Sequence, residues 1–246
     1  MSLTLIDPLQ PVSEIVRSNY RTADVFKKYG INYCCGGQVS LADVCSTRNI
    51  DYGQMAIELE GATRSVKLPS SLQFSEWKLD FLADYIMNVH HAYLYLAIPS
   101  LESGLDVFVA GHKEKYPELI DLQEIFTELT RVLMPHIQHE DEIVFPYIKQ
   151  INAAHRRNES YGNLFVKTLR KPLTCIEIVH DEMSGLLLEL ESYTRDFNYP
   201  GSACTNHQVI FHKLKEFYDD MQQHMHLEDN ILYPKAKEIE LHLLRP

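Results

Sequence analysis

The stretch that decides the fold of this chain reads His136-Ile137-Gln138-His139-Glu140-Asp141-Glu142-Ile143-Val144-Phe145-Pro146. A close copy begins 88 residues later: His224-Met225-His226-Leu227-Glu228-Asp229-Asn230-Ile231-Leu232-Tyr233-Pro234. Both copies place Glu four residues after His, then Asp, and then Ile, an aromatic residue and Pro at the same offsets. Because positions i and i+4 lie on one face of a helix, each copy presents an imidazole and a carboxylate side by side.

The repeat extends upstream of both copies. Val89-His90 precedes His136 by 46 residues, and Val179-His180 precedes His224 by 44 residues. The sequence therefore indicates a duplicated helical hairpin, each hairpin carrying one His on its first helix and His-x3-Glu on its second. Folded into a bundle, the two hairpins bring six candidate metal ligands to one level: His90, His136, Glu140, His180, His224 and Glu228.

Four imidazoles and two carboxylates suit a pair of metal ions. Each Glu can bridge both ions with its two oxygens, so that each ion receives two imidazoles and one oxygen from each Glu. A solvent-derived oxo or hydroxo bridge would add a fifth ligand and leave a sixth position open. Such a ligand set favours redox iron, with manganese second, whereas zinc usually takes four ligands in a tetrahedron.

The alternative is that these histidines have a structural role and bind no metal. A single His on an apolar helix face is more often a hydrogen-bonded core residue than a ligand, but matched positions in two repeats are difficult to explain that way. Asp141 and Asp229 follow the two Glu residues, and we prefer Glu because a position five along turns away from the His. We interpret His139 and His226 as outer-sphere or surface residues. The histidines without a repeat partner are interpreted as solvated or structural: His91, His112, His155, His207, His212 and His242.

Size and composition limit the class of protein. The chain has 246 residues, of which 45% are hydrophobic, so it can bury a core in one domain or two. The net charge of −11 and the absence of a Lys/Arg run argue against nucleic-acid binding. We recognise neither a signal peptide nor an apolar run long enough to span a membrane. Five cysteines do not make a disulfide framework in a chain this long, which predicts reduced thiols and a cytoplasmic protein.

The hydrophobic periodicity predicts an all-α protein in two domains. Residues 1–65 form a small helical module, 66–75 a linker, and 76–246 an up-and-down four-helix bundle. In the small domain, Ser40 and Asp51 are expected to cap short helices. Four long helices are expected in the bundle: one through His90, one over about 118–151, one from about 172, and one over about 206–241.

The small domain contains Cys34-Cys35-Gly36-Gly37. Two glycines after two cysteines predict a tight turn that exposes the thiols or allows a close approach of backbone. The pair is either inert or presents thiolates to iron or to redox exchange, since reactivity depends on exposure and pKa. Cys45, Cys175 and Cys204 are interpreted as packing residues.

The run from Asp24 to Gly37, Asp-Val-Phe-Lys-Lys-Tyr-Gly-Ile-Asn-Tyr-Cys-Cys-Gly-Gly, resembles the opening domain of the "repair of iron centres" (RIC) family. The remainder resembles the hemerythrin-like bundle of that family. The resemblance implies a cytoplasmic, often dimeric protein with a non-haem di-iron centre held by the same six residues that the spacing selects. It also implies a role for the cysteine pair. Respiratory hemerythrins have a further His where this chain has Ser184, so the site resembles an oxygen carrier less closely.

Four functions are compatible with these patterns. The first is repair of iron–sulfur clusters damaged by nitrosative or oxidative stress, through donation of iron to the damaged proteins. The second is an enzyme that reduces nitric oxide at the two irons, and the third is a sensor of oxygen or nitric oxide. The fourth is a purely structural bundle. We favour the iron donor over an enzyme with turnover.

Overall fold

The computed structural model describes the chain in five stretches: residues 6–34, 37–64, 72–157, 166–167 and 176–244. Over these residues the protein is helical, without a named strand, and its one isolated bridge joins Pro11 and Ser40. This confirms the predicted all-α class. Cys35, Cys175 and most of the predicted linker lie outside the described residues.

The chain divides into two compact units. The first comprises Met1–Pro69 together with Phe197–Lys215, and the second comprises Ser70–Asp196 with Glu216–Pro246. The sequence-based division assigned 197–215 to the bundle, whereas the structure groups this segment with the N-terminal residues.

The described residues of the N-terminal part of the first unit form four short helices: α1 (Val12–Ser18), α2 (Thr22–Lys28), α3 (Leu41–Arg48) and α4 (Tyr52–Thr63). The predicted caps are present, because Ser40 Oγ accepts a hydrogen bond from Asp43 N at 3.2 Å and Asp51 Oδ1 accepts one from Gln54 N at 2.7 Å. Each satisfies a backbone N–H that a helix start leaves without a partner. The apolar faces meet in a core that includes Val12, Phe26, Leu41, Met55 and Leu59.

Glycine is required at two turns of this unit. Gly30 follows α2 with a φ of +66°, in the left-handed region that ends many helices. A Cβ on Gly37 would collide with the backbone carbonyl of Tyr33. The close backbone approach that the sequence predicts after the cysteine pair is therefore present, and Cys34 beside it is half-buried.

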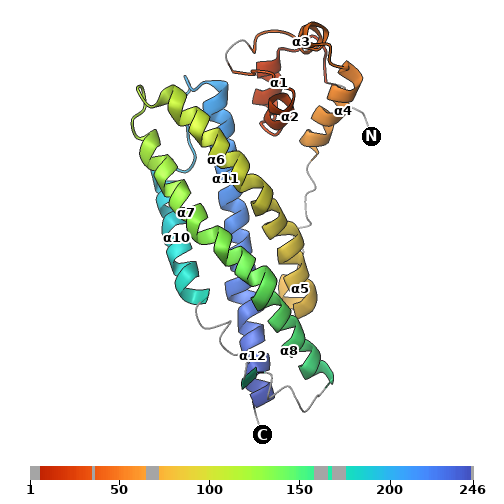
Figure 1. Cartoon of the computed structure of the whole chain (residues 1–246), viewed down its shortest axis with the longest axis vertical. Coiled ribbons are helices and arrows are strands. Elements are labelled where there is room, and N and C mark those ends of the chain that lie inside the picture. The colour runs from red at the N-terminus through yellow and green to blue at the C-terminus, as the bar shows by residue number, and fades with distance from the viewer. Residues whose placement is uncertain (1–5, 35–36, 65–71, 158–165, 168–175, 245–246) are drawn as a thin grey trace. The chain divides into compact units, whose positions relative to one another are not determined.

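The bundle is built from long helices that run alongside one another (Figure 1). The first consists of α5 (Leu79–Tyr85), η2 (Ile86–His91) and α6 (Ala92–His112), preceded by the short η1 (Phe74–Glu76). The second consists of α7 (Leu119–His139), η3 (Glu140–Val144) and α8 (Phe145–Arg157). The third is α10 (Ile176–Tyr193), and the last consists of α11 (Thr205–Leu227), η5 (Glu228–Leu232) and α12 (Tyr233–Leu244).

Apolar side chains pack between the helices on both sides of the polar site along the bundle. At one end, residues such as Leu82, Ile86, Phe145, Ile148 and Leu232 form a buried cluster. Further along, Phe126 of α7 meets Phe217 of α11 with ring centroids 5.3 Å apart. Because these side chains are closely packed, they hold the helices in fixed positions. Metal ligands on facing helices need such support to keep their geometry.

Among the described residues, the π-helical segments η2, η3 and η5 each contribute a side chain to one group: His91, Glu140 and Glu228. A π-helical turn has an i→i+5 hydrogen bond and is frequently found at functional sites. Glu140 and Glu228 each open such a segment, at the same place in the two sequence copies.

One helical stretch among the described residues, Leu79–His112, is long and apolar enough by length and composition to cross a membrane. Core helices of bundles pass the same test. This stretch packs against α7 and α8 within the bundle.

Candidate metal centre

Two groups of buried His and Glu side chains meet in the middle of the bundle. The first cluster is formed by His91, Glu140, His224 and Glu228, and the second cluster by His136, Glu140, His180 and Glu228. Within each cluster the four ligand atoms lie within 4.8 Å of one another. The two glutamates belong to both clusters and are completely buried.

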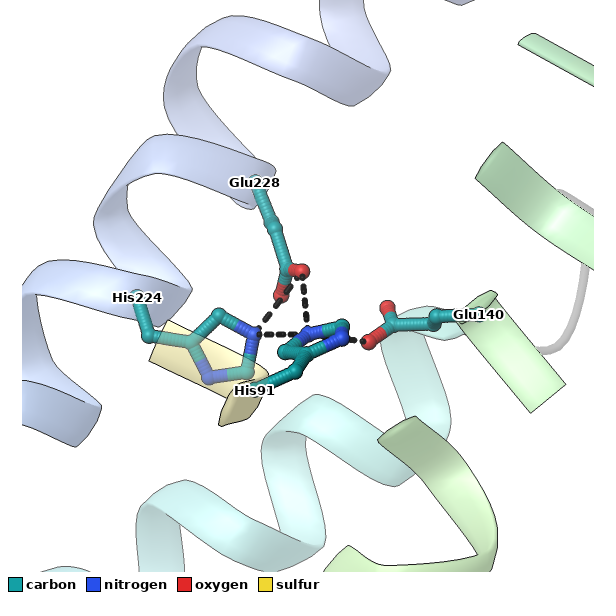
Figure 2. A group of neighbouring side chains, drawn as sticks. All are labelled: His91, Glu140, His224 and Glu228. Atoms are coloured by element: carbon teal, nitrogen blue, oxygen red, sulfur yellow. Dashed lines mark hydrogen bonds and ion pairs between the residues drawn. The ribbon is translucent and has the colours of Figure 1, made fainter. Parts of the chain in front are cut away.

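In the first cluster, two imidazoles from opposite halves of the chain converge on the carboxylates (Figure 2). His224 Nε2 lies 3.0 Å from His91 Nε2 and 2.9 Å from Glu228 Oε1. His91 Nε2 lies 3.5 Å from Glu140 Oε2. The oxygens that face this cluster are therefore Glu228 Oε1 and Glu140 Oε2.

The second cluster repeats this geometry with the remaining pair of imidazoles. His180 Nε2 lies 2.8 Å from His136 Nε2, and His136 Nε2 lies 3.0 Å from Glu140 Oε1. His180 Nε2 is 3.6 Å from Glu228 Oε2. Each glutamate thus turns one oxygen toward each cluster, which is the arrangement of a carboxylate that bridges two cations.

The donor set fits a pair of metal ions. Metal–nitrogen bonds of about 2.1 Å at right angles would put two nitrogens about 3.0 Å apart, close to the Nε2–Nε2 distances of 3.0 and 2.8 Å in the two clusters. Glu140 Oε2 and Glu228 Oε2 are buried and make no hydrogen bond with the part of the chain that the structure describes. A buried carboxylate oxygen is costly unless a positive charge or donors satisfy it.

Without metal, protons supply that positive charge. Burial opposes a charged imidazole, but hydrogen bonds with Asp141 and Glu228 and the charge of Glu140 outweigh it and raise the pKa of His91 to about 10. The pKa of His180 is also raised to about 10, because hydrogen bonds with Asp229 and Glu140 likewise outweigh burial.

The carboxylates respond in the opposite direction. Burial raises the pKa of Glu140, but its hydrogen bonds with His136 and His180 hold that pKa well below the ordinary value. The pKa of Glu228 is also lowered, because His224 and His91 outweigh burial and the charge of Glu140. The metal-free site therefore favours ionised Glu140 and Glu228 beside protonated His91 and His180.

An aspartate orients one histidine of each cluster from behind. Asp141 Oδ1 lies 2.6 Å from His91 Nδ1, and Asp229 Oδ1 lies 2.7 Å from His180 Nδ1. Tyr95 donates a hydrogen bond of 3.0 Å to Asp141 Oδ2. Such a carboxylate places the proton on Nδ1 and leaves Nε2 free to face the site. The Asp that follows each Glu therefore contacts a His on another helix.

At one position the structure differs from the sequence-based expectation: His91, rather than His90, lies in the first cluster. The physical reason is η2, which spans Ile86–His91. In an α-helix the residue above Ile86 on the core face is His90, whereas the i→i+5 spacing of a π-helix moves that place to His91. His90 is nonetheless buried, with Nδ1 2.9 Å from Asp220 Oδ1.

A signal for His91 was present in the sequence. His91 precedes His180 by 89 residues, closer than His90 to the 88-residue offset between the two His-x3-Glu copies. The other five predicted residues all lie in the clusters: His136, Glu140, His180, His224 and Glu228.

The remaining polar candidates lie elsewhere. His139 and His226 are exposed, in agreement with their interpretation as surface residues. Cys45 is buried, with its thiol 3.6 Å from the sulfur of Met55, as a packing residue would be.

Sequence reasoning missed Tyr233. Its hydroxyl donates a short hydrogen bond to Glu140 Oε1, the oxygen that faces the second cluster. Burial and the charges of Glu140 and Glu228 raise the pKa of Tyr233 well above its ordinary value, so it stays a donor. At the matching position of the other repeat stands Phe145, whose ring stacks on His91 with centroids 5.3 Å apart.

Comparison with known families agrees with this geometry. The hemerythrin HHE cation binding domain matches residues 82–236, more than half of the chain. The chain therefore belongs to the hemerythrin HHE cation-binding family. A second model, ScdA_N, described as a domain of unknown function (DUF542), matches residues 8–63.

Individual relatives extend the similarity over almost the whole chain. The chain is 28% identical over 227 residues to the iron-sulfur cluster repair protein YtfE of Escherichia coli O157:H7, covering 92% of this chain and 96% of the relative. The protein of the same name from Escherichia fergusonii is 27% identical over 227 residues, with the same coverage.

Proposed function

We propose that this chain is a di-iron protein that repairs iron–sulfur clusters damaged by nitrosative or oxidative stress, by donating iron to the damaged proteins. The observation that carries the proposal is that the two clusters share Glu140 and Glu228. Each of these glutamates directs one carboxylate oxygen toward the first cluster and the other toward the second. The repair activity is supported by similarity to relatives named iron-sulfur cluster repair protein, because the similar region covers 96% of the relative's length.

Iron is the cation that suits these donors best. Two imidazoles and two carboxylate oxygens per ion are a mixed nitrogen and oxygen set, which favours iron over zinc. His91 and His224 would hold one ion, His136 and His180 the other, and both glutamates would bridge them. Two irons bound in this way would supply redox-active metal with a position open to an oxo or hydroxo bridge.

The residues of the chain also provide for release. Metal affinity falls when ligands gain protons, and in the metal-free cluster the pKa of His91 and that of His180 are raised to about 10, so protons compete with the metal for these two rings. Iron held at such a centre exchanges against protons, which suits a cargo ion that has to leave.

We further propose that the protein acts in the cytoplasm as a homodimer and that damaged iron–sulfur proteins are its partners. Cys34 and Cys35 would receive outgoing iron. Nitric oxide or oxygen would be a small ligand of the irons rather than the substrate of a turnover reaction, because the names of the relatives describe repair.

Iron transfer tests this function. The protein is loaded anaerobically with ferrous iron, the irons per chain are counted, and it is mixed with an iron–sulfur enzyme whose cluster nitric oxide has damaged. We expect about two irons per chain and a return of activity that tracks the movement of iron to the enzyme. Iron that loads but stays on the protein would contradict donation.

Two variants sharpen the comparison. The Glu140→Gln, Glu228→Gln double variant should neither load iron nor restore activity. His139→Gln changes an exposed histidine of the same helix and should behave as the unmodified protein. Continuous formation of nitrous oxide with an electron donor, in place of one transfer per protein, would show an enzyme instead.

A further inference from the structure

A buried histidine–aspartate pair lies directly behind the first cluster. His90 Nδ1 lies 2.9 Å from Asp220 Oδ1, and the His90 side chain is only 2% exposed while that of Asp220 is 19% exposed. The His90 ring stacks on His224 of the first cluster, with centroids 5.9 Å apart and planes 11° from parallel. The pair therefore reaches from the first cluster toward a partly exposed carboxylate.

This pair contains buried polar atoms that have no hydrogen-bond partner among the described residues. They are His90 Nε2 and Asp220 Oδ2, and beside them His224 Nδ1. Buried polar atoms are nearly always satisfied, so several together require an explanation. A carboxylate facing Nδ1 places the His90 proton there and leaves Nε2 as a lone pair. An imidazole nitrogen and a carboxylate oxygen are both ligand atoms for iron.

The sequence repeat does not duplicate this pair. With the offset of 89 residues that relates His91 to His180, the counterpart of His90 is Val179. With the offset of 88 residues that relates His136 to His224, the counterpart of Asp220 is Val132. At the two corresponding positions of the repeat the chain therefore has valines in place of the imidazole and the carboxylate.

We propose that His90 and Asp220 form a transient cation site through which iron leaves and enters the first cluster, so that this ion exchanges before the one in the second cluster. The proposal rests on the proposed function, since it requires that the two clusters hold iron. It assigns a route and an order of release to the two ions.

The physical basis is the cost of moving a charge through an apolar interior. A cation that leaves its ligands without new ones meets a large desolvation penalty. On the side of the first cluster, His90 Nε2 and Asp220 Oδ2 can replace the ligands that are lost, and water reaches the partly exposed Asp220. The valines at the corresponding repeat positions offer no such ligand. No electron is transferred: coordinate bonds to the cluster break as bonds to the pair form.

Release kinetics test the proposal. The protein loaded with two ferrous ions is mixed rapidly with excess ferrous chelator, and the coloured complex is followed. We expect two phases of one iron each. In the His90→Val, Asp220→Val double variant both residues become valine, the residue at the corresponding repeat positions. This variant should still load two irons, but its fast phase of release should be at least tenfold slower.

Further variants keep the result interpretable. Asp220→Asn retains the shape of the side chain while removing its charge, so it should slow the fast phase even if the double variant folds poorly. His139→Gln should leave both phases unchanged. Thermal unfolding of each metal-free variant checks that the fold is intact.

The outcomes separate this inference from the proposed function. A protein that loads two irons but releases both in one phase, or whose fast phase survives in the double variant and in Asp220→Asn, would overturn the exit route alone. Failure to load two irons, or repair without movement of iron, would overturn the proposed function instead.

Discussion

The two clusters of the bundle are built from the same kinds of side chain but have different surroundings. In both, His-x3-Glu supplies an imidazole and a carboxylate, and the following Asp holds a histidine of another helix, at 2.6 Å in one half and 2.7 Å in the other. Other repeat positions differ. Tyr233 corresponds to Phe145, and the residues that correspond to His90 and Asp220 are Val179 and Val132. The repeat keeps the His and Glu side chains of the two clusters alike, while their neighbours make the two clusters unequal.

The largest expected effect tests what the halves share. Glu140→Gln and Glu228→Gln should each abolish binding of both ions rather than one, because each carboxylate faces both clusters. Counting irons per chain after anaerobic loading measures this. A variant that retains one tightly bound iron would show that the carboxylate serves only one cluster, and His226→Gln, which changes an exposed residue, is the control.

The second prediction concerns the metal-free protein at alkaline pH. The pKa of His91 and that of His180 are raised to about 10 from an ordinary value of 6.5. The stability that these protonated rings contribute is therefore fully present below pH 6.5 and is lost as pH rises through 10. Loss of buried charge pairs costs several kcal/mol, so the melting temperature should fall by roughly 10 °C between pH 7 and pH 11.

The Asp141→Asn, Asp229→Asn double variant provides the matched comparison for that experiment. Groups that do not interact with Asp141 or Asp229 titrate alike in both proteins, whereas the variant lacks the charges that help to raise the pKa of the two histidines and, through Asp141, that of Tyr95. Its alkaline loss of stability should be smaller and should be complete at a lower pH, because the loss ends at the folded-state pKa of the histidines. Superimposable pH profiles would show that the aspartates do not set these pKa values.

The third prediction separates the two clusters by changing one aspartate at a time. Asp141→Asn should weaken binding in the first cluster and Asp229→Asn in the second, each by about 10–100-fold, because a carboxylate behind a ligand histidine fixes its tautomer and orientation. Asp141 should have the larger effect, since its side chain is 19% exposed and that of Asp229 is 39% exposed. Two-site titration with cobalt(II) measures both affinities. Equal weakening of both sites by either variant would contradict the assignment.

Much of this site could be predicted from the sequence because the repeat is strict where the helices are regular. A fixed i, i+4 spacing identified His136, Glu140, His224 and Glu228 without knowledge of the bundle. His90 was predicted in place of His91 because an α-helical period was assumed across Ile86–His91, where the helix is π. A one-residue change of register of this kind leaves the hydrophobic pattern nearly unaltered.

Contacts between helices were less accessible to sequence reasoning. Asp141 was set aside because it turns away from His136 on its own helix, which is correct, yet its partner is His91 on the neighbouring helix. Tyr233 aligned with Phe145 as another aromatic residue, and only the structure shows its hydroxyl on Glu140. Periodicity predicts which face a residue occupies and not which group it meets across the bundle.

The smallest expected effect tests the difference between those two aromatic residues. The Tyr233 hydroxyl satisfies Glu140 Oε1 on the side of the second cluster, and Phe145 gives Glu228 no such donor. Tyr233→Phe should therefore weaken the second cluster, by about tenfold or less, because a hydrogen bond to a charged group contributes about 1.5–3 kcal/mol and metal coordination would replace part of it.

Phe145→Tyr is the reciprocal change, and the two variants together decide whether the hydroxyl or the mere volume of the ring matters. If the hydroxyl orients the bridging carboxylate, the added donor should strengthen the first cluster and bring the two cobalt(II) affinities closer together. If Tyr233→Phe leaves both affinities unchanged, the hydrogen bond belongs only to the metal-free protein, where it satisfies a buried oxygen that a cation would otherwise bind. The inequality of the two positions would then rest on His90 and Asp220 alone.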